Sequence, residues 1–188
     1  MILLTEFLDN VRERCKGKNY FVRLPVLVLF AYILFRYMKD PLYCSVFSGV
    51  TLGVHELGHF IFNLFGMFMG VAGGTIAQLA APIIVGIGFY RQGDFFAVTF
   101  ALGWLSTSLF DAARYIADAR ELVLPLVSPF GNEDIVHDWN YMLNELGILQ
   151  YDTRIASIVT GIAIITMMVA LISGSWLLWQ MVRQPAKN

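Results

Sequence analysis

The sequence contains one short pattern in which metal-binding and proton-transferring side chains stand together. His55 and His59 are four residues apart and Glu56 follows the first histidine, so the pattern is H-E-x-x-H. Positions four apart lie on one face of an α-helix, so both imidazoles can reach one metal ion. Glu56 then lies beside them, where it can take a proton from metal-activated water. Zn²⁺ suits such a site because it accepts imidazole nitrogen and lowers the pKa of its water to about 7.

Chance rarely produces this pattern in a chain with so few histidines. With three histidines and six glutamates, roughly one or two chance matches are expected per thousand such chains. The alternative is that both histidines merely pack or hydrogen-bond inside a helix. Ionisable groups in an apolar helix cost roughly 3 kcal/mol each and usually mark function. No Lys or Arg stands in the same apolar segment to neutralise them, so we favour metal binding.

A catalytic metal site needs a third protein ligand, and the residues leave that choice open. We expect His137 first, because the chain then uses all its histidines at one site. Asp138 is the rival ligand, and it could instead orient His137 through a hydrogen bond. Asp118 and Asp111 are weaker candidates, for which a salt bridge to a neighbouring arginine is the alternative.

Two features of the segment after the motif also have two interpretations each. Gln78 is a polar group inside an apolar stretch, and it could contact a substrate backbone or hydrogen-bond a neighbouring helix. Gly70, Gly73 and Gly74 would loosen the chain or let two helices approach closely, as small residues do in membranes.

The composition indicates a membrane protein. Of the 188 residues, 57% are hydrophobic and only 14% are charged, whereas a soluble domain has about 25% charged residues. The net charge of −1 leaves no basic field for nucleic acid. Cys15 and Cys44 flank the first apolar segment on opposite sides, so we expect no disulfide between them.

Five segments are long and apolar enough to form membrane spans. A bilayer core about 30 Å thick needs around 20 mostly apolar helical residues. The segments are 20–38, 42–69, 75–90, 95–110 and 155–182, and four or six spans are the alternatives. We therefore expect an all-α, polytopic transmembrane helix bundle with a single domain over 1–188.

The stretch before the last span is different in character. Residues 111–154 carry eight of the 14 acidic residues. The helical spacing of apolar residues over 138–149 predicts an interfacial helix at the membrane edge, or one that folds back into the bundle. The first ten residues have a similar amphipathic pattern.

The basic residues give an expected orientation. Five of them precede the first apolar segment, where they would contact lipid headgroups: Arg12, Arg14, Lys16, Lys18 and Arg23. An N-terminus in the cytoplasm would also place Arg114, Arg120 and Arg154 there, which makes eight of the 13 basic residues. The positive-inside rule therefore favours a cytoplasmic N-terminus.

The sequence resembles the site-2 protease family of intramembrane zinc metalloproteases. The resemblance covers roughly 42–149 and consists of HELGH at 55–59 in an apolar segment, two following spans and a later acidic or histidine-containing segment. It implies a zinc ion held by His55 and His59, with Glu56 as general base, and peptide-bond cleavage within or beside the bilayer. The family's third ligand is typically an Asp in a Leu-Asp-Gly motif, which this chain lacks. Residues 137–139, His-Asp-Trp, stand about where that motif is expected, and alignment by role favours Asp138.

The expected function is a membrane-embedded zinc endopeptidase with one Zn²⁺ per chain and a membrane protein or peptide as substrate. The alternative is a non-proteolytic relative that binds metal or holds transmembrane segments like a chaperone. Glu56 argues against that alternative, because metal binding alone does not need it. A transporter would require matching broken helices in two halves of the chain, and the sequence shows none.

Overall fold

The secondary structure of the described chain is helical. We use a computed structural model that describes residues 2–125 and 136–184, with side chains from Thr5 onward. The helices are α1 (Ile2–Cys15), α2 (Leu24–Lys39), α3 (Ser48–Phe62), α4 (Met67–Gln92), α5 (Phe95–Ala117), α6 (Asp138–Glu145) and α7 (Asp152–Arg183), with short 3₁₀ turns at Asn63–Phe65 and Leu149–Tyr151. No strand occurs within these ranges, which confirms the all-α expectation.

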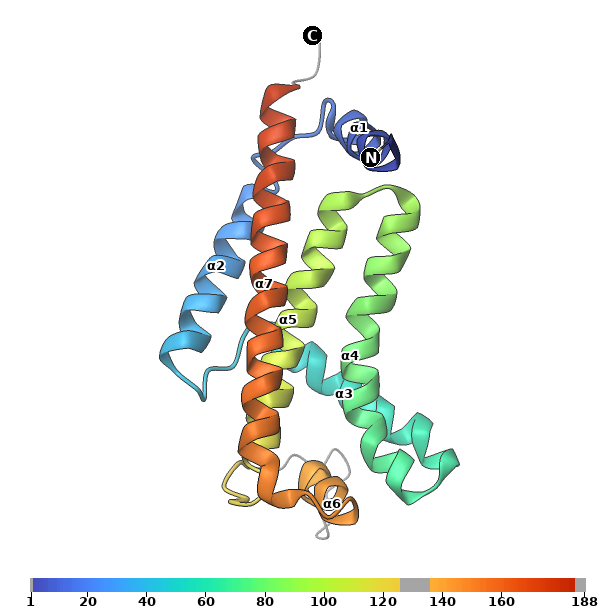
Figure 1. The fold of residues 1–188 in the computed structure, drawn as a ribbon, viewed down its shortest axis with the longest axis vertical. Helices are drawn as coiled ribbons and strands as arrows, with labels where there is room; N and C mark the ends of the chain where they lie inside the picture. Colours follow the sequence, from blue (N-terminus) through green and yellow to red (C-terminus); the bar gives the residue numbers. More distant parts are fainter. Residues whose placement is uncertain (1, 126–135, 185–188) are drawn as a thin grey trace.

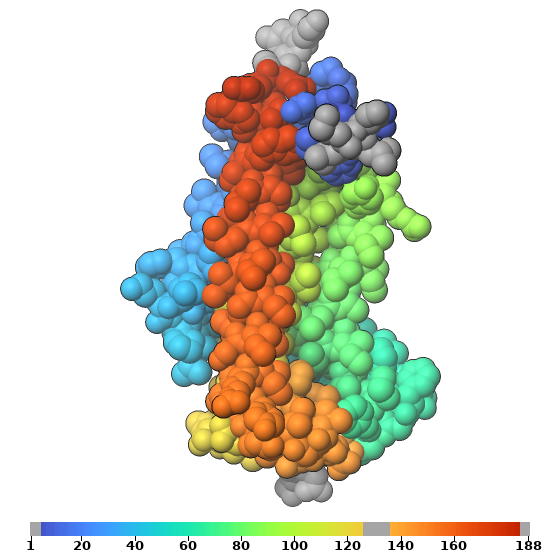
Figure 2. Space-filling model, viewed as in Figure 1, coloured from blue at the N-terminus to red at the C-terminus, as the bar shows by residue number. Residues whose placement is uncertain are grey.

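Three helices are long and apolar enough to cross a membrane, namely α4, α5 and the helix that ends at Arg183. At 1.5 Å per residue they are about 39, 35 and 48 Å long, more than a bilayer core of about 30 Å. They stand side by side along the long axis of the molecule (Figure 1). α7 extends over nearly the whole length of one face (Figure 2). This arrangement is compatible with a membrane protein.

The expected count of five spans is not confirmed. α2 and α3 have 16 and 15 residues, which gives lengths of about 24 and 22 Å. The segment 42–69 does not form one continuous helix. α3 ends at Phe62, the chain turns through Gly66 at φ +96°, and α4 begins at Met67. Because side chains disfavour a positive φ, glycine permits this reversal.

Glycine also allows α3 and α4 to pack closely. A Cβ atom on Gly58 would lie 2.2 Å from the carbonyl oxygen of Gly73, and one on Gly73 would lie 2.6 Å from the oxygen of Gly58. The two backbones therefore touch where neither residue has a side chain, which is the small-residue packing typical of membrane helices. This contact aligns the motif helix along the first half of α4.

Two shorter helices lie across opposite ends of the bundle (Figure 1). α1 covers the end where α4 turns into α5, and the N–H of Gly17 donates to the carbonyl oxygen of Gln184 there at 3.1 Å. α6 lies across the other end, between α5 and α7 in the chain. The expected interfacial segment before the last helix thus contains α6.

The structure separates the two groups of basic residues that the expected orientation places together. The five basic residues from Arg12 to Arg23 belong to the α1 end, whereas Arg114, Arg120 and Arg154 lie near the end of α5 and the start of α7, at the α6 end (Figure 1). If α5 and α7 cross a membrane, one side cannot receive both groups, because the two helices separate them along their length. The cytoplasmic N-terminus stays a prediction that rests on the first group alone.

Candidate metal centre

The two motif histidines project from one face of α3. Their ring centroids are 4.6 Å apart, and the rings are nearly perpendicular. His55 is buried, with 7% of its surface exposed, whereas His59 is partly exposed. The helical register predicted from their spacing is the one observed.

Asp138 completes this group from the other side. It is the first residue of α6, and its Oδ2 atom lies 2.9 Å from Nε2 of His55 and 3.2 Å from Nε2 of His59. The ligand atoms of the three residues all lie within 4.8 Å of one another, so the group could hold a metal ion. Burial acts to raise the pKa of Asp138, but its contacts with the two imidazoles prevail and lower the pKa below its ordinary value.

The opposite ring nitrogens are held by protein acceptors. Nδ1 of His55 lies 2.9 Å from Oε1 of Gln78, and the amide nitrogen of Gln78 donates to the carbonyl oxygen of Ser108 at 2.7 Å. That second bond orients the amide, so Gln78 presents its oxygen to His55. Nδ1 of His59 donates to the carbonyl oxygen of Gly70 at 2.8 Å. With Nδ1 held by an acceptor in each ring, Nε2 is the nitrogen that each imidazole turns toward Asp138 and could offer to a metal ion.

This donor set fits a cation. Two nitrogen lone pairs and a carboxylate oxygen repel one another unless a proton or metal ion lies between them. A tetrahedral zinc site with bonds of about 2.05 Å separates its ligand atoms by roughly 3.3 Å, close to the 2.9 and 3.2 Å found here. Gly74 preserves the space, because a Cβ there would lie 2.5 Å from Nε2 of His55 and 2.6 Å from that of His59.

Glu56 lies next to His55 on α3 and makes no hydrogen bond or ion pair with the described side chains. It is half-buried on α3, three residues from His59, and interacts electrostatically with His59 and Tyr115. No hydrogen bond or ion pair joins it to the described part of the chain. Since residues three apart are neighbours on a helix surface, its carboxylate is available beside the metal-binding group.

His137 does not join the metal-binding group. Its Nδ1 accepts the N–H of Asn140 at 3.2 Å and so caps the start of α6. Its Nε2 lies 3.3 Å from Oδ2 of Asp118, and its ring lies beside that of Tyr115, with centroids 4.2 Å apart and the planes tilted by 42°. Burial lowers the pKa of His137. The geometry thus offers Asp138, rather than the preferred His137, as the third ligand.

The two weaker candidates are also occupied elsewhere. Asp118 accepts the N–H groups of Val123 and Leu124 at 2.9 and 3.1 Å, in the turn after α5. Asp111 accepts from Tyr37 and Ser48 at 3.1 and 3.0 Å. Its other neighbour is Arg114 at 3.7 Å, the salt bridge given as its alternative.

Sequence reasoning missed Tyr115. Its hydroxyl accepts the backbone N–H of Asp138 at 3.1 Å, and its ring also faces His55 with centroids 6.2 Å apart. Tyr115 therefore joins α5 to the residue that completes the group. A tyrosine near the end of an apolar segment was the available signal, but tyrosines are common at that position in membrane helices.

Comparisons with known proteins gave no match for this chain. No protein-family model matches it, and no curated protein or solved structure is significantly similar to it. The candidate site is therefore assigned from its residues and geometry.

Proposed function

We propose that this protein is a membrane-embedded zinc endopeptidase that hydrolyses peptide bonds of transmembrane or membrane-adjacent substrates. The observation that carries the proposal is the combination of His55, His59 and Asp138 with a neighbouring Glu56 that makes no hydrogen bond or ion pair with the residues that the structure describes. Metal storage would need only the three ligands. A free carboxylate beside an oriented metal group is what water activation requires.

Each residue of the site has a separate role in the proposed hydrolysis. His55, His59 and Asp138 would hold the ion, while Gln78 and the carbonyl of Gly70 keep the imidazoles in one tautomer. Bound Zn²⁺ would polarise the scissile carbonyl and make water more acidic. Glu56 takes a proton from the attacking water while the water oxygen bonds to the carbonyl carbon of the substrate. Glu56 then gives that proton to the amide nitrogen as the C–N bond breaks, which regenerates the carboxylate.

We also propose that α2 and α3 enter the bilayer together with the three long helices, which gives a multi-pass integral membrane protein. Phe35 on α2 is 57% exposed, and Leu57 and Phe60 on α3 are 55% and 77% exposed. Lipid would cover these apolar side chains without cost. A substrate that reaches the site through lipid must be locally unwound, because an intact helix hides its peptide bonds.

The deciding experiment is Glu56→Gln in the purified chain in lipid nanodiscs. We expect the variant to keep one Zn²⁺ per chain by mass spectrometry and to lose about 10²–10⁴-fold in cleavage rate on a panel of transmembrane peptides, because the general base is lost. Glu145→Gln, at the exposed end of α6, is the matched control and should cleave like wild type.

Undiminished cleavage by Glu56→Gln would remove the proposed mechanism. Stoichiometric zinc in the wild-type protein with no turnover of any peptide would instead favour the non-proteolytic, metal-binding alternative.

A further inference from the structure

A second site lies at the opposite end of the bundle from the metal centre. A cavity of about 220 Å³ opens where α1 and the α1–α2 linker meet the turn between α4 and α5. Pockets for drug-sized ligands have volumes of about 300–1,000 Å³, so this smaller cavity suits a small charged group. Three basic side chains line it, Arg14, Lys18 and Arg23, together with one acidic side chain, Asp94.

The three cations have no acidic partner among the described residues. Arg12 and Lys16, from the same stretch, are paired with Asp9 and Glu13. Arg23, by contrast, donates only to the carbonyl oxygen of Asn19 at 2.8 Å and lies over the Phe96 ring. The two basic residues that form ion pairs, Arg12 and Lys16, are therefore not part of the cavity lining, whereas the three without an acidic partner are.

Asp94 does not neutralise this wall. Its Oδ1 accepts the N–H of Ala97 at 3.1 Å and caps α5. Arg14 lies instead over Gly93, where a Cβ atom would be 2.9 Å from its Cζ. Three positive charges against one negative charge leave the lining with an excess of two positive charges.

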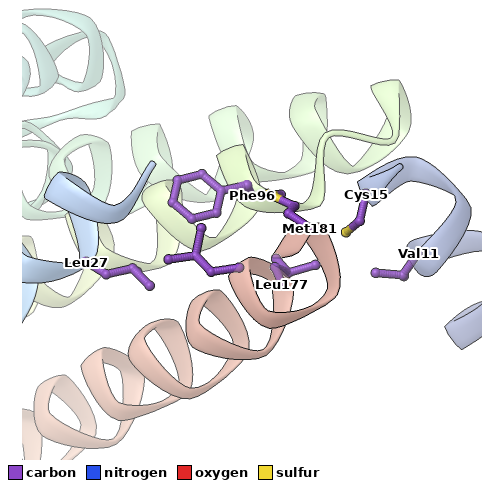
Figure 3. Close-up of a cluster of buried hydrophobic side chains, with 7 residues drawn as sticks. Val11, Cys15, Leu27, Phe96, Leu177 and Met181 are labelled. Carbon is purple, nitrogen blue, oxygen red and sulfur yellow. The ribbon is translucent and has the colours of Figure 1, made fainter. Parts of the chain in front are cut away.

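The inner side of the cavity is apolar. Cys15, Phe96, Leu177 and Met181 line it and belong to the buried cluster shown in Figure 3. The cavity also lies at the end of α4 and the start of α5, two helices long enough to cross a membrane. If α4 and α5 cross a bilayer, the cavity lies at the level of the phospholipid headgroups, whose phosphates stand above their acyl chains.

We propose that this cavity binds an anionic phosphate group, either free phosphate or the phosphomonoester headgroup of a lipid, with Arg14, Lys18 and Arg23 as its ligands. Arginine and lysine bind phosphate oxygens through charge-assisted hydrogen bonds. The apolar inner wall would accept the glycerol and the start of an acyl chain when the phosphate belongs to a lipid. The inference is independent of the peptidase proposal, because no residue of the metal centre takes part.

The test compares three probes on the full chain in maltoside micelles: dihexanoyl phosphatidic acid, dihexanoyl phosphatidylcholine and inorganic phosphate. We expect phosphatidic acid to bind, and Arg14→Gln/Lys18→Gln to weaken that binding about tenfold or more through loss of charge-assisted bonds. Arg12→Gln/Lys16→Gln removes the same charge outside the cavity and should stay within about twofold of wild type. Lys18→Gln alone, at an exposed position, supplies a measurable loss if the double variant does not fold.

Each outcome has a defined meaning. Tighter binding of phosphatidic acid than of inorganic phosphate assigns the site to a lipid headgroup, and equal binding of the two assigns it to free phosphate. Equal losses in both double variants would show general charge attraction and overturn the site. Phosphatidylcholine bound as tightly as phosphatidic acid, or no binding of either anionic probe, would overturn it too.

Discussion

At the scale of single residues, the candidate metal centre depends on groups that hold its two imidazoles in place. Gln78 and the carbonyl of Gly70 determine which nitrogen of each imidazole faces Asp138, and Gly74 keeps that space open. An imidazole free to flip would present a proton to the ion for part of the time. Ordered ligands thus come from groups that never contact the metal.

Gln78→Leu should weaken metal binding about 10–100-fold, because it removes the acceptor that holds His55 and leaves the Ser108 carbonyl without its donor. A competition titration against a chelator measures the change. Gln150→Leu, at an exposed position, is the control. An unchanged affinity in Gln78→Leu would mean that the tautomer of His55 is set by another group.

Gly74→Ala tests whether the space between the imidazoles is used. We expect loss of bound metal, because the added Cβ would lie within 2.6 Å of both Nε2 atoms. Gly88→Ala lies in the same helix with nothing within 4 Å of its Cβ. That control should keep the metal and melt at the same temperature or slightly higher, since alanine favours helix over glycine by about 0.5–1 kcal/mol. Full metal occupancy in Gly74→Ala would contradict the site.

At the scale of elements, the candidate metal centre is formed by side chains of two separate helices, α3 and α6. α3 supplies two ligands from its middle, and α6 supplies the third from its first residue. His137 and Tyr115 hold that first residue, one by capping α6 and the other by accepting the N–H of Asp138. A movement of α6 would therefore change the distances between Asp138 and the two imidazoles.

His137 and Asp138 can be separated by substitution. Asp138→Ala should abolish one-to-one zinc binding, because it removes a ligand. His137→Ala should keep the stoichiometry and reduce affinity only about fivefold, the cost of a lost helix cap of about 1 kcal/mol. Calorimetric titration with Zn²⁺ measures both. The opposite ranking would make His137 the third ligand and displace Asp138.

At the scale of the whole molecule, the two polar sites lie at opposite ends of the long helices. The basic cavity adjoins α1, and the metal group adjoins α6 (Figure 1). If the long helices cross a bilayer, the two sites lie toward opposite membrane surfaces. The end with α1 carries the unpaired cations, so the positive-inside rule places it in the cytoplasm and α6 on the other side.

The two cysteines of the chain allow the proposed membrane orientation to be tested by labelling. Cys44 is exposed in the linker after α2, whereas Cys15 is buried and burial raises the pKa of its thiol. A membrane-impermeant maleimide added outside intact cells at neutral pH should label wild type and Cys15→Ser but not Cys44→Ser. Labelling of Cys44 only after the membrane is permeabilised would reverse the orientation.

The helical content and the placement of His55, Glu56 and His59 followed from the sequence, because a helical repeat of 3.6 residues is a local property. The apolar composition likewise indicated helices suited to lipid. The position of Asp138 beside the two imidazoles was decided only by tertiary structure, since Asp138 is 83 residues from His55. Its neighbour His137 is the extended residue that caps α6, whereas Asp138 is the first residue of the helix, so the His137 side chain lies against Asp118 and the Asp138 side chain against the imidazoles. Tertiary structure also decided that the basic residues before α2 and those near the end of α5 lie at opposite ends of the molecule. The direction of each helix depends on packing between helices and not on local spacing in the sequence.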